Sequence, residues 1–120
     1  MIVTNVDTAQ VLGDRIRLAL RLGARLRGLM WRPPLEEGEG LWIVPCNSIH
    51  MFFVRFPLDI LFLDEELRIV GLEHALPPNR LRGHRRACTV LELPAGTLAR
   101  TGTQVGHGVS LRGGAPEATP

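Results

Sequence analysis

The sequence predicts a single, mainly β domain: a β-sandwich or partly closed barrel of six or seven short strands with one or two short helices. Three observations support this class. Apolar runs of about four to eight residues recur between glycine, proline and acidic turns. Only one stretch repeats its leucines with a helical period. The 120 residues suit one domain that buries roughly two thirds of the unfolded chain's surface.

In the N-terminal part, the pattern changes from strand to helix. A β-type run at 2–6 is followed by a turn or hairpin at 11–14. Residues 15–20 alternate polar and apolar side chains, as a half-buried strand does. Beyond them a helix is expected over 22–30, ended by a Pro-Pro pair; one helix over 18–31 is the alternative. The apolar face of the helix consists of Leu22, Leu26, Leu29 and Met30.

The remainder of the chain is expected to be almost entirely β. The domain spans residues 1–112, and the Gly- and Pro-rich end at 113–120 is expected to be a disordered tail. The expected elements, in order, are a strand at 41–44, a hairpin of strands 58–63 and 68–76, a loop at 77–86, a strand at 88–93, a short helical piece at 97–100 and a strand at 105–111.

The charge balance limits the partners to expect. Fourteen basic residues, all arginine, face twelve acidic residues, so nucleic acid is not an expected partner. Because guanidinium groups bind carboxylate and phosphate, a small anionic ligand or a protein partner is expected instead. No stretch approaches the ~20 apolar residues of a membrane helix, and no signal-type segment is visible. We expect a cytoplasmic protein, away from membranes, with reduced thiols.

The most informative stretch, 46–64, is an apolar run that contains a histidine, an arginine and an aspartate. A period of two places Asp59 on the same strand face as two leucines. An isolated carboxylate in an apolar layer is costly unless it is paired or hydrogen-bonded. We therefore expect Asp59 to be buried, with His50 and Arg55 as its nearest candidate partners in the sequence.

Two interpretations of this constellation stay open. Asp59 is either a structural keystone that accepts backbone N–H groups of the 46–57 loop, with Arg55 as counter-ion, or an acid–base partner of His50 in a pocket. Trp42 and Glu92 are possible neighbours in this buried polar network.

A second set of residues contains both cysteines. Cys46-x3-His50 and His84-x3-Cys88 mirror each other and could together supply two thiolates and two imidazoles to zinc. The spacing within each pair is loose for a structural zinc site, and a buried free cysteine often acts as a small hydrophobe. No phosphate-binding glycine motif is present, so no cofactor is expected.

Three blocks of sequence, 27–30, 46–64 and 90–96, occur together and in this order. In combination they resemble the uncharacterised prokaryotic family called domain of unknown function 192, over about residues 20 to 111. The resemblance implies a small β-rich domain and brings no reaction, substrate or cofactor with it. Val54 stands where such sequences often have methionine, and His107 where an aspartate is more usual. If that aspartate contributes to a shared site, its loss weakens a catalytic interpretation.

The function predicted first is a small non-enzymatic binding or accessory protein with a pocket around His50, Arg55 and Asp59. The alternative is a hydrolase-like or zinc-dependent enzyme that uses His50 with Asp59, or the two Cys/His pairs, so enzymatic activity stays an open question. A structural subunit of a larger complex is a third class, which an exposed apolar patch would favour.

Overall fold

The computed structural model describes residues 1–20, 32–52 and 54–113. These ranges hold ten strands and one short helix, α2. The elements are β1 (Ile2–Asn5), β2 (Val11–Gly13), β3 (Arg15–Ala19), β4 (Glu39–Ile43), β5 (Ser48–His50), β6 (Leu58–Leu63), β7 (Ile69–Leu76), β8 (Leu81–Gly83), β9 (Thr89–Pro94), α2 (Thr97–Thr101) and β10 (Val109–Arg112).

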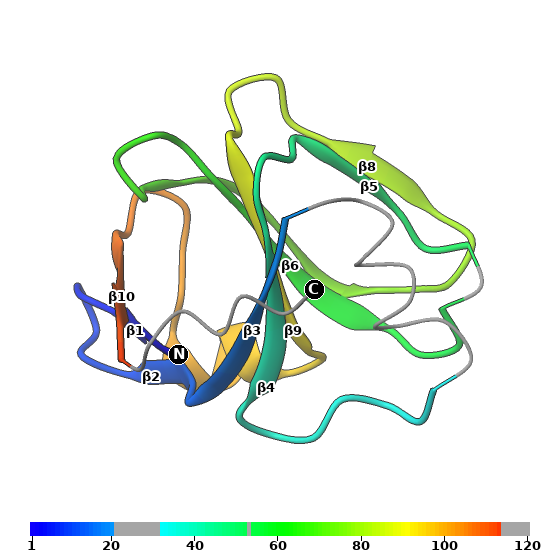
Figure 1. Cartoon of the computed structure of the whole chain (residues 1–120), viewed down its shortest axis with the longest axis horizontal. Coiled ribbons are helices and arrows are strands. Elements are labelled where there is room, and N and C mark those ends of the chain that lie inside the picture. The colour runs from blue at the N-terminus through cyan, green and yellow to red at the C-terminus, as the bar shows by residue number, and fades with distance from the viewer. Residues whose placement is uncertain (21–31, 53, 114–120) are drawn as a thin grey trace.

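A five-stranded sheet in the order β3-β4-β9-β6-β7 forms the centre of the molecule. The β3–β4 pair is parallel and the other pairs are antiparallel. A three-stranded sheet, β10-β1-β2, lies on one side, and the two-stranded β5–β8 ribbon lies on the other (Figure 1). All six residues of β6 are buried, because a strand in the middle of a covered sheet has apolar neighbours on both faces.

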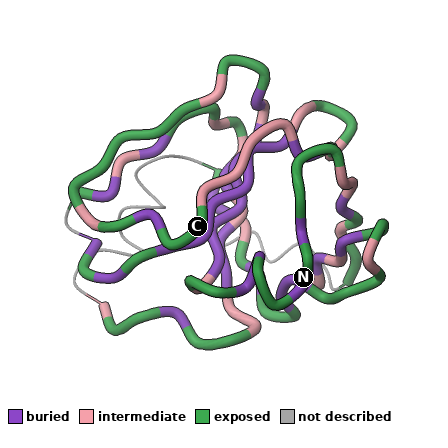
Figure 2. The backbone as a smooth tube through the Cα atoms, turned by 180° about the vertical axis from the view of Figure 1, so that it is seen from behind, coloured by how far each residue is buried: buried purple, intermediate pink, exposed green. Residues whose placement is uncertain are grey.

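Strand alternation divides the buried side chains into two cores, one on each face of the central sheet. We call them the α2 face and the ribbon face. The α2 face carries Leu61, Leu63, Leu91 and Leu93, and is covered by residues of β1, β2, α2 and β10. The ribbon face carries Leu58, Ile60, Phe62 and Val90, and is covered by Ile49, Met51, Val54 and Phe56. Figure 2 shows the buried residues concentrated along the central strands.

The mainly β class is confirmed, and the hairpin predicted for 58–76 is present as β6 and β7. The loop predicted over 77–86 is wrong in part, because it contains β8, which pairs with β5. Periodicity gave no sign of this ribbon: each strand has three residues, and all three in β8 are exposed. Within the described residues, no helix is long and apolar enough to cross a membrane.

Some expectations shift or cannot be compared. The last strand begins at Val109 rather than at 105, because turn backbone with Gly106 at φ 96° precedes it. The helix expected over 22–30 and the tail beyond 113 lie outside the described residues.

Candidate functional site

Asp59 is fully buried, with 0% of its surface exposed, as the sequence predicts. Both carboxylate oxygens accept backbone hydrogen bonds. The Ala75 N–H donates to Oδ1 (N···O 2.7 Å) and the Leu98 N–H donates to Oδ2 (N···O 2.8 Å). The expected donors in the 46–57 loop are therefore wrong: the carboxylate ties β6 to β7 and to α2. Such charge-assisted bonds offset the cost of burying the carboxylate.

Local backbone geometry explains why these two N–H groups are available. The β6–β7 register shifts between Leu58 and Ile60, and Ala75 has a positive φ of 47°, so β7 bulges opposite Asp59. At the other oxygen, α2 begins after Gly96, which has no side chain to cap the helix. The N–H groups of a first helical turn have no partner within the helix, and Asp59 accepts one of them from a distant strand.

The central sheet separates the residues of the predicted network. Asp59 and Trp42 belong to strand positions on the α2 face. His50 and Arg55 lie in the segment that packs on the ribbon face. Glu92, also 0% exposed, sits on the ribbon face between its strand partners Leu41 and Ile60. The acid–base pair of His50 with Asp59 is therefore not brought together across the sheet.

The four candidate zinc ligands do not form one group, although Cys46 and Cys88 are neighbours. His50 lies at the far end of the ribbon, opposite Leu81, with its ring stacked on Phe52 at a centroid distance of 5.2 Å. The Arg86 N–H donates to Nδ1 of His84 (N···N 3.2 Å). Across the residues that the structure describes, no group of three or more His, Cys, Asp or Glu side chains could hold a metal ion.

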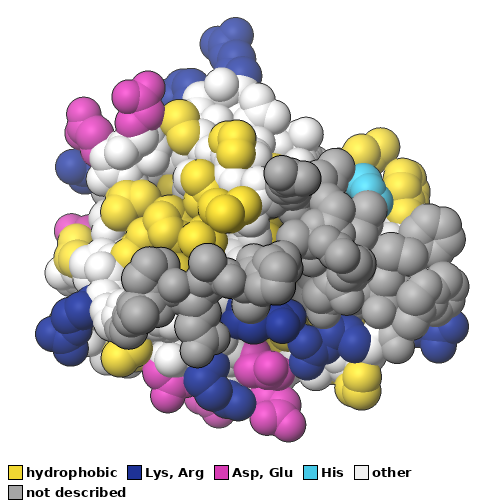
Figure 3. Space-filling model, viewed as in Figure 1, with side chains coloured by type: hydrophobic (Ala, Val, Ile, Leu, Met, Phe, Trp, Pro, Cys, Tyr) yellow, Lys and Arg dark blue, Asp and Glu magenta, His cyan; other side chains and the backbone are white. Residues whose placement is uncertain are grey.

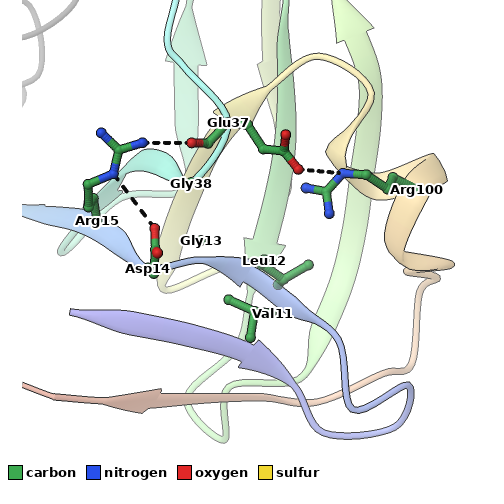
Figure 4. A pocket seen from close by; sticks show the side chains of 8 residues that line it. All are labelled: Val11, Leu12, Gly13, Asp14, Arg15, Glu37, Gly38 and Arg100. Atoms are coloured by element: carbon green, nitrogen blue, oxygen red, sulfur yellow. Dashed lines mark hydrogen bonds and ion pairs between the residues drawn. The ribbon is translucent and has the colours of Figure 1, made fainter.

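Sequence reasoning missed a charged cleft of about 330 Å³ between the β2–β3 turn, the loop before β4, and α2. Figure 4 shows Arg15 and Arg100 approaching Glu37 from opposite sides. The Arg15 guanidinium donates to the Glu37 carbonyl (N···O 2.7 Å), while Arg100 Nε lies 3.4 Å from the Glu37 carboxylate. We call this the arginine cleft. It is lined by Val11, Leu12, Gly13, Asp14, Arg15, Glu37, Gly38 and Arg100.

Two glycines allow the walls of the arginine cleft to approach each other. A Cβ on Gly13 would lie 2.9 Å from the Gly38 carbonyl oxygen, closer than real side chains come. Gly38 has φ +92°, and a Cβ there would lie 2.5 Å from Oδ1 of Asp14. The Arg15 N–H donates to the Gly38 carbonyl (N···O 2.8 Å), which fixes the loop against the start of β3. Glycine is required at position 13 by the approach of a backbone oxygen, and at position 38 by the positive φ, because the Asp14 side chain could move aside.

The ion pairs in the arginine cleft are loose. Arg15 lies 3.7 Å from Asp14 and 3.7 Å from Glu36, and every side chain in these pairs is largely exposed. Exposed pairs of this kind contribute about 0–1 kcal/mol and exchange partners readily. Figure 3 shows basic and acidic side chains interspersed along the lower edge of the molecule, without a large patch of one sign.

Glu39, at the start of β4, is held more firmly than the acids of the cleft. The Glu36 N–H donates to its Oε1 (N···O 2.7 Å), and this bond lowers the pKa of Glu39 below its ordinary value. Partial burial acts in the opposite direction, and the charges of Arg32 and Arg15 lower the pKa of Glu39 further. Glu39 therefore stays ionised where the chain enters the central sheet.

Asp59 and the arginine cleft are linked through α2. The bond from Leu98 to Asp59 fixes the first turn of the helix, and Arg100 projects from the same helix two residues later. The buried carboxylate thus positions one wall of the cleft without touching it. In the sequence, nothing distinguishes Arg15 or Arg100 from the other exposed arginines, so only the fold could show that they converge.

Fold and cleft together define a compact, mainly β single-domain protein with a charged surface cleft. The chain belongs to the DUF192 family, described as "Uncharacterized ACR", whose model matches residues 2–111.

Known proteins resemble this chain in sequence or in fold. The chain is 29% identical over 107 residues to a "UPF0127 protein" of Thermococcus sibiricus, covering 85% of this chain and 69% of the relative. A crystal structure of a protein of unknown function from Novosphingobium aromaticivorans matches with a TM-score of 0.77 and 26% identity, over 92% of this chain and 82% of that one. A Sinorhizobium meliloti protein, described only as a candidate transcription regulator, has a TM-score of 0.76 at 24% identity, over 91% and 89% of the two chains; this likeness concerns the fold alone.

Proposed function

We propose that the protein is a small non-enzymatic binding or accessory protein, and that the arginine cleft binds a small ligand through a carboxylate or phosphate group. One observation carries the proposal: Arg15 and Arg100 come from β3 and α2, far apart in the chain, and line the same cleft. Guanidinium groups bind planar and tetrahedral anions with two parallel hydrogen bonds.

The loose internal ion pairs favour exchange with a ligand. Contacts of 3.4 Å and 3.7 Å between guanidinium nitrogens and carboxylates are longer than the roughly 2.7–2.9 Å of a charge-assisted hydrogen bond. A ligand anion that displaces the Glu37 carboxylate from Arg100 can form shorter hydrogen bonds to the guanidinium group, and only a weak internal ion pair is lost. Asp14 and Glu37 also line the cleft, so a ligand with one anionic group is favoured over a highly charged one.

The separation of His50 from Asp59 favours binding over the enzyme alternative. Acid–base catalysis needs both groups within reach of one substrate. Asp59 is fully buried on the α2 face, and each of its carboxylate oxygens accepts a hydrogen bond from a backbone N–H group. Its location therefore supports the interpretation of Asp59 as a structural keystone. We therefore propose that the small anionic ligand expected near His50 and Arg55 binds in the arginine cleft instead.

Calorimetric titration of the full chain with inorganic phosphate and with succinate, at low ionic strength, tests the proposal. We expect binding of at least one anion that weakens with added salt, because surface electrostatics is screened. Arg15→Gln and Arg100→Gln should each weaken it by roughly tenfold or more, as expected for a lost hydrogen bond to a charged group. Arg112→Gln, a matched change on β10 outside the cleft, should leave it unchanged.

Two results would contradict the proposal. Binding that falls equally in all three variants indicates nonspecific charge attraction rather than a site. Absence of any heat or thermal shift with either anion, at concentrations up to the millimolar range, removes the cleft as an anion site.

A further inference from the structure

The fold brings the chain's two cysteines, 42 positions apart in the sequence, to one cleft. Cys46 follows β4 and Cys88 precedes β9, and the Cys46 N–H donates to the Cys88 carbonyl (N···O 2.9 Å). Both are half-buried and neither forms a disulfide. They line a cleft of about 420 Å³, which Pro45, Asn47 and Ala87 complete. We call it the thiol cleft.

Its chemistry differs from that of the arginine cleft. Thiol, proline and alanine side chains form most of the lining, with the Asn47 amide as the polar side chain. Thiolates are soft, polarisable ligands that select ions such as Cu(I) over hard cations. A structural zinc site needs four ligands. Among the described residues, no third His, Cys, Asp or Glu side chain joins the two thiols in a metal-binding group.

We propose that Cys46 and Cys88 form a two-thiolate site for one soft, thiophilic metal ion of the Cu(I) class. Each thiol releases one proton and each sulfur forms one bond to the ion, so no electron is transferred and no oxidant is needed. The Cys46 thiol gives up its hydrogen bond to the Ser48 carbonyl (S···O 3.0 Å) on binding. Exposed Arg85 and Arg86, shortly before Cys88, place positive charge on the loop that carries the resulting anionic complex.

The backbone contact supplies the required proximity. The Cys88 N–H donates to the Leu63 carbonyl (N···O 2.7 Å), so the two cysteines share one backbone bond beside the cleft that both line. Neighbouring residues of this kind allow both side chains to reach a common ion. They also allow a disulfide, which is therefore the rival outcome that the experiment has to distinguish.

Anaerobic titration of the reduced full chain with Cu(I), in competition with a chromophoric Cu(I) chelator, tests the site. We expect one Cu(I) per chain, and protection of both thiols from iodoacetamide when Cu(I) is bound. Cys46→Ser and Cys88→Ser should each weaken Cu(I) binding by more than about a hundredfold. Loss of a residue that binds the metal directly should lower the affinity at least as much as loss of a residue that only supports such a ligand. Asn47→Ala, which changes the same cleft but no thiol, should bind normally.

Several results would overturn the assignment. These are a stoichiometry near zero, equal Cu(I) affinity in the wild type and both serine variants, or Zn²⁺ binding as tight as Cu(I). An intramolecular disulfide, recognised by the loss of two hydrogen masses together with an absence of metal uptake, would show a redox pair instead. If a serine variant fails to fold, thiol protection in the wild-type chain decides the question by itself.

Discussion

The two faces of the central sheet are held by different kinds of contact. On the α2 face, buried polar groups tie the covering elements together. Asp59 accepts N–H groups from β7 and α2, and the buried Asn5 amide donates to Thr103 Oγ1 (N···O 3.1 Å). On the ribbon face, where Glu92 is also buried, the contacts of the cover include apolar side chains such as Ile49 and backbone bonds, among them Met51 N–H to the Arg80 carbonyl (N···O 2.8 Å).

The kind of contact determines how firmly a covering element is oriented. Buried hydrogen bonds are directional and fix α2, and with it Arg100, in one orientation. Apolar contacts such as those of Ile49 are non-directional and add burial without fixing an angle. Position 107, where similar sequences more often have an aspartate, also makes polar contacts on the α2 face. His107 Nδ1 lies 3.1 Å from the Asn5 amide nitrogen and accepts the Gln104 N–H (N···N 3.2 Å). A hydrogen-bond acceptor is what this position contributes to the α2 face.

The largest effect is expected from Asp59→Ala, which removes the polar link on the α2 face. The free energy of unfolding should fall by about 2–4 kcal/mol, because two buried N–H groups lose a charged acceptor. Urea melts measure the loss, and amide hydrogen exchange should accelerate at Ala75 and Leu98 before it does on the ribbon face. A loss below about 1 kcal/mol, typical of a surface change, would contradict the keystone role.

A slightly smaller effect is expected from Ile49→Ala, the corresponding test of the ribbon face. Ile49 is 2% exposed, and truncating a buried isoleucine costs about 2–3 kcal/mol through lost burial and a residual cavity. Leu81→Ala on the paired strand is the matched control, because Leu81 is 62% exposed and should change stability by less than about 0.5 kcal/mol. Exchange should accelerate at Met51 and His84 and leave Leu98 protected. Equal acceleration on both faces would show that the two faces do not respond separately.

The smallest effect is expected from Glu39→Gln, at the entrance to the central sheet. Because the folded state lowers the pKa of Glu39 from its ordinary value of 4.5, its carboxylate stabilises the fold above that value, and this contribution is lost as the pH falls through the lowered pKa. We expect the wild type to exceed the variant by about 0.5 kcal/mol at pH 7, and by nothing near pH 2.

Urea melts at the two pH values measure the contribution of Glu39, with Glu65→Gln in an exposed turn as the matched control. A difference between the wild type and Glu39→Gln that grows toward low pH would have the wrong sign for this account.

The sequence by itself determined the mainly β class, the β6–β7 hairpin and the burial of Asp59. Each follows from local information: an apolar run between turn residues predicts a strand, and the phase of Asp59 with Leu61 and Leu63 assigns it to a buried face. Once Asp59 is buried, its carboxylate must accept hydrogen bonds, whichever groups donate them.

Only the tertiary structure decided which donors reach Asp59, on which face His50 lies, and which side chains share a cleft. The donors come from Ala75 and Leu98, and the arginine cleft joins β3 to α2, so each contact closes a long loop of chain. Periodicity reports the environment of a residue along its own strand. It carries no information about the partner that another part of the chain brings to it, because that choice depends on how the sheets pack.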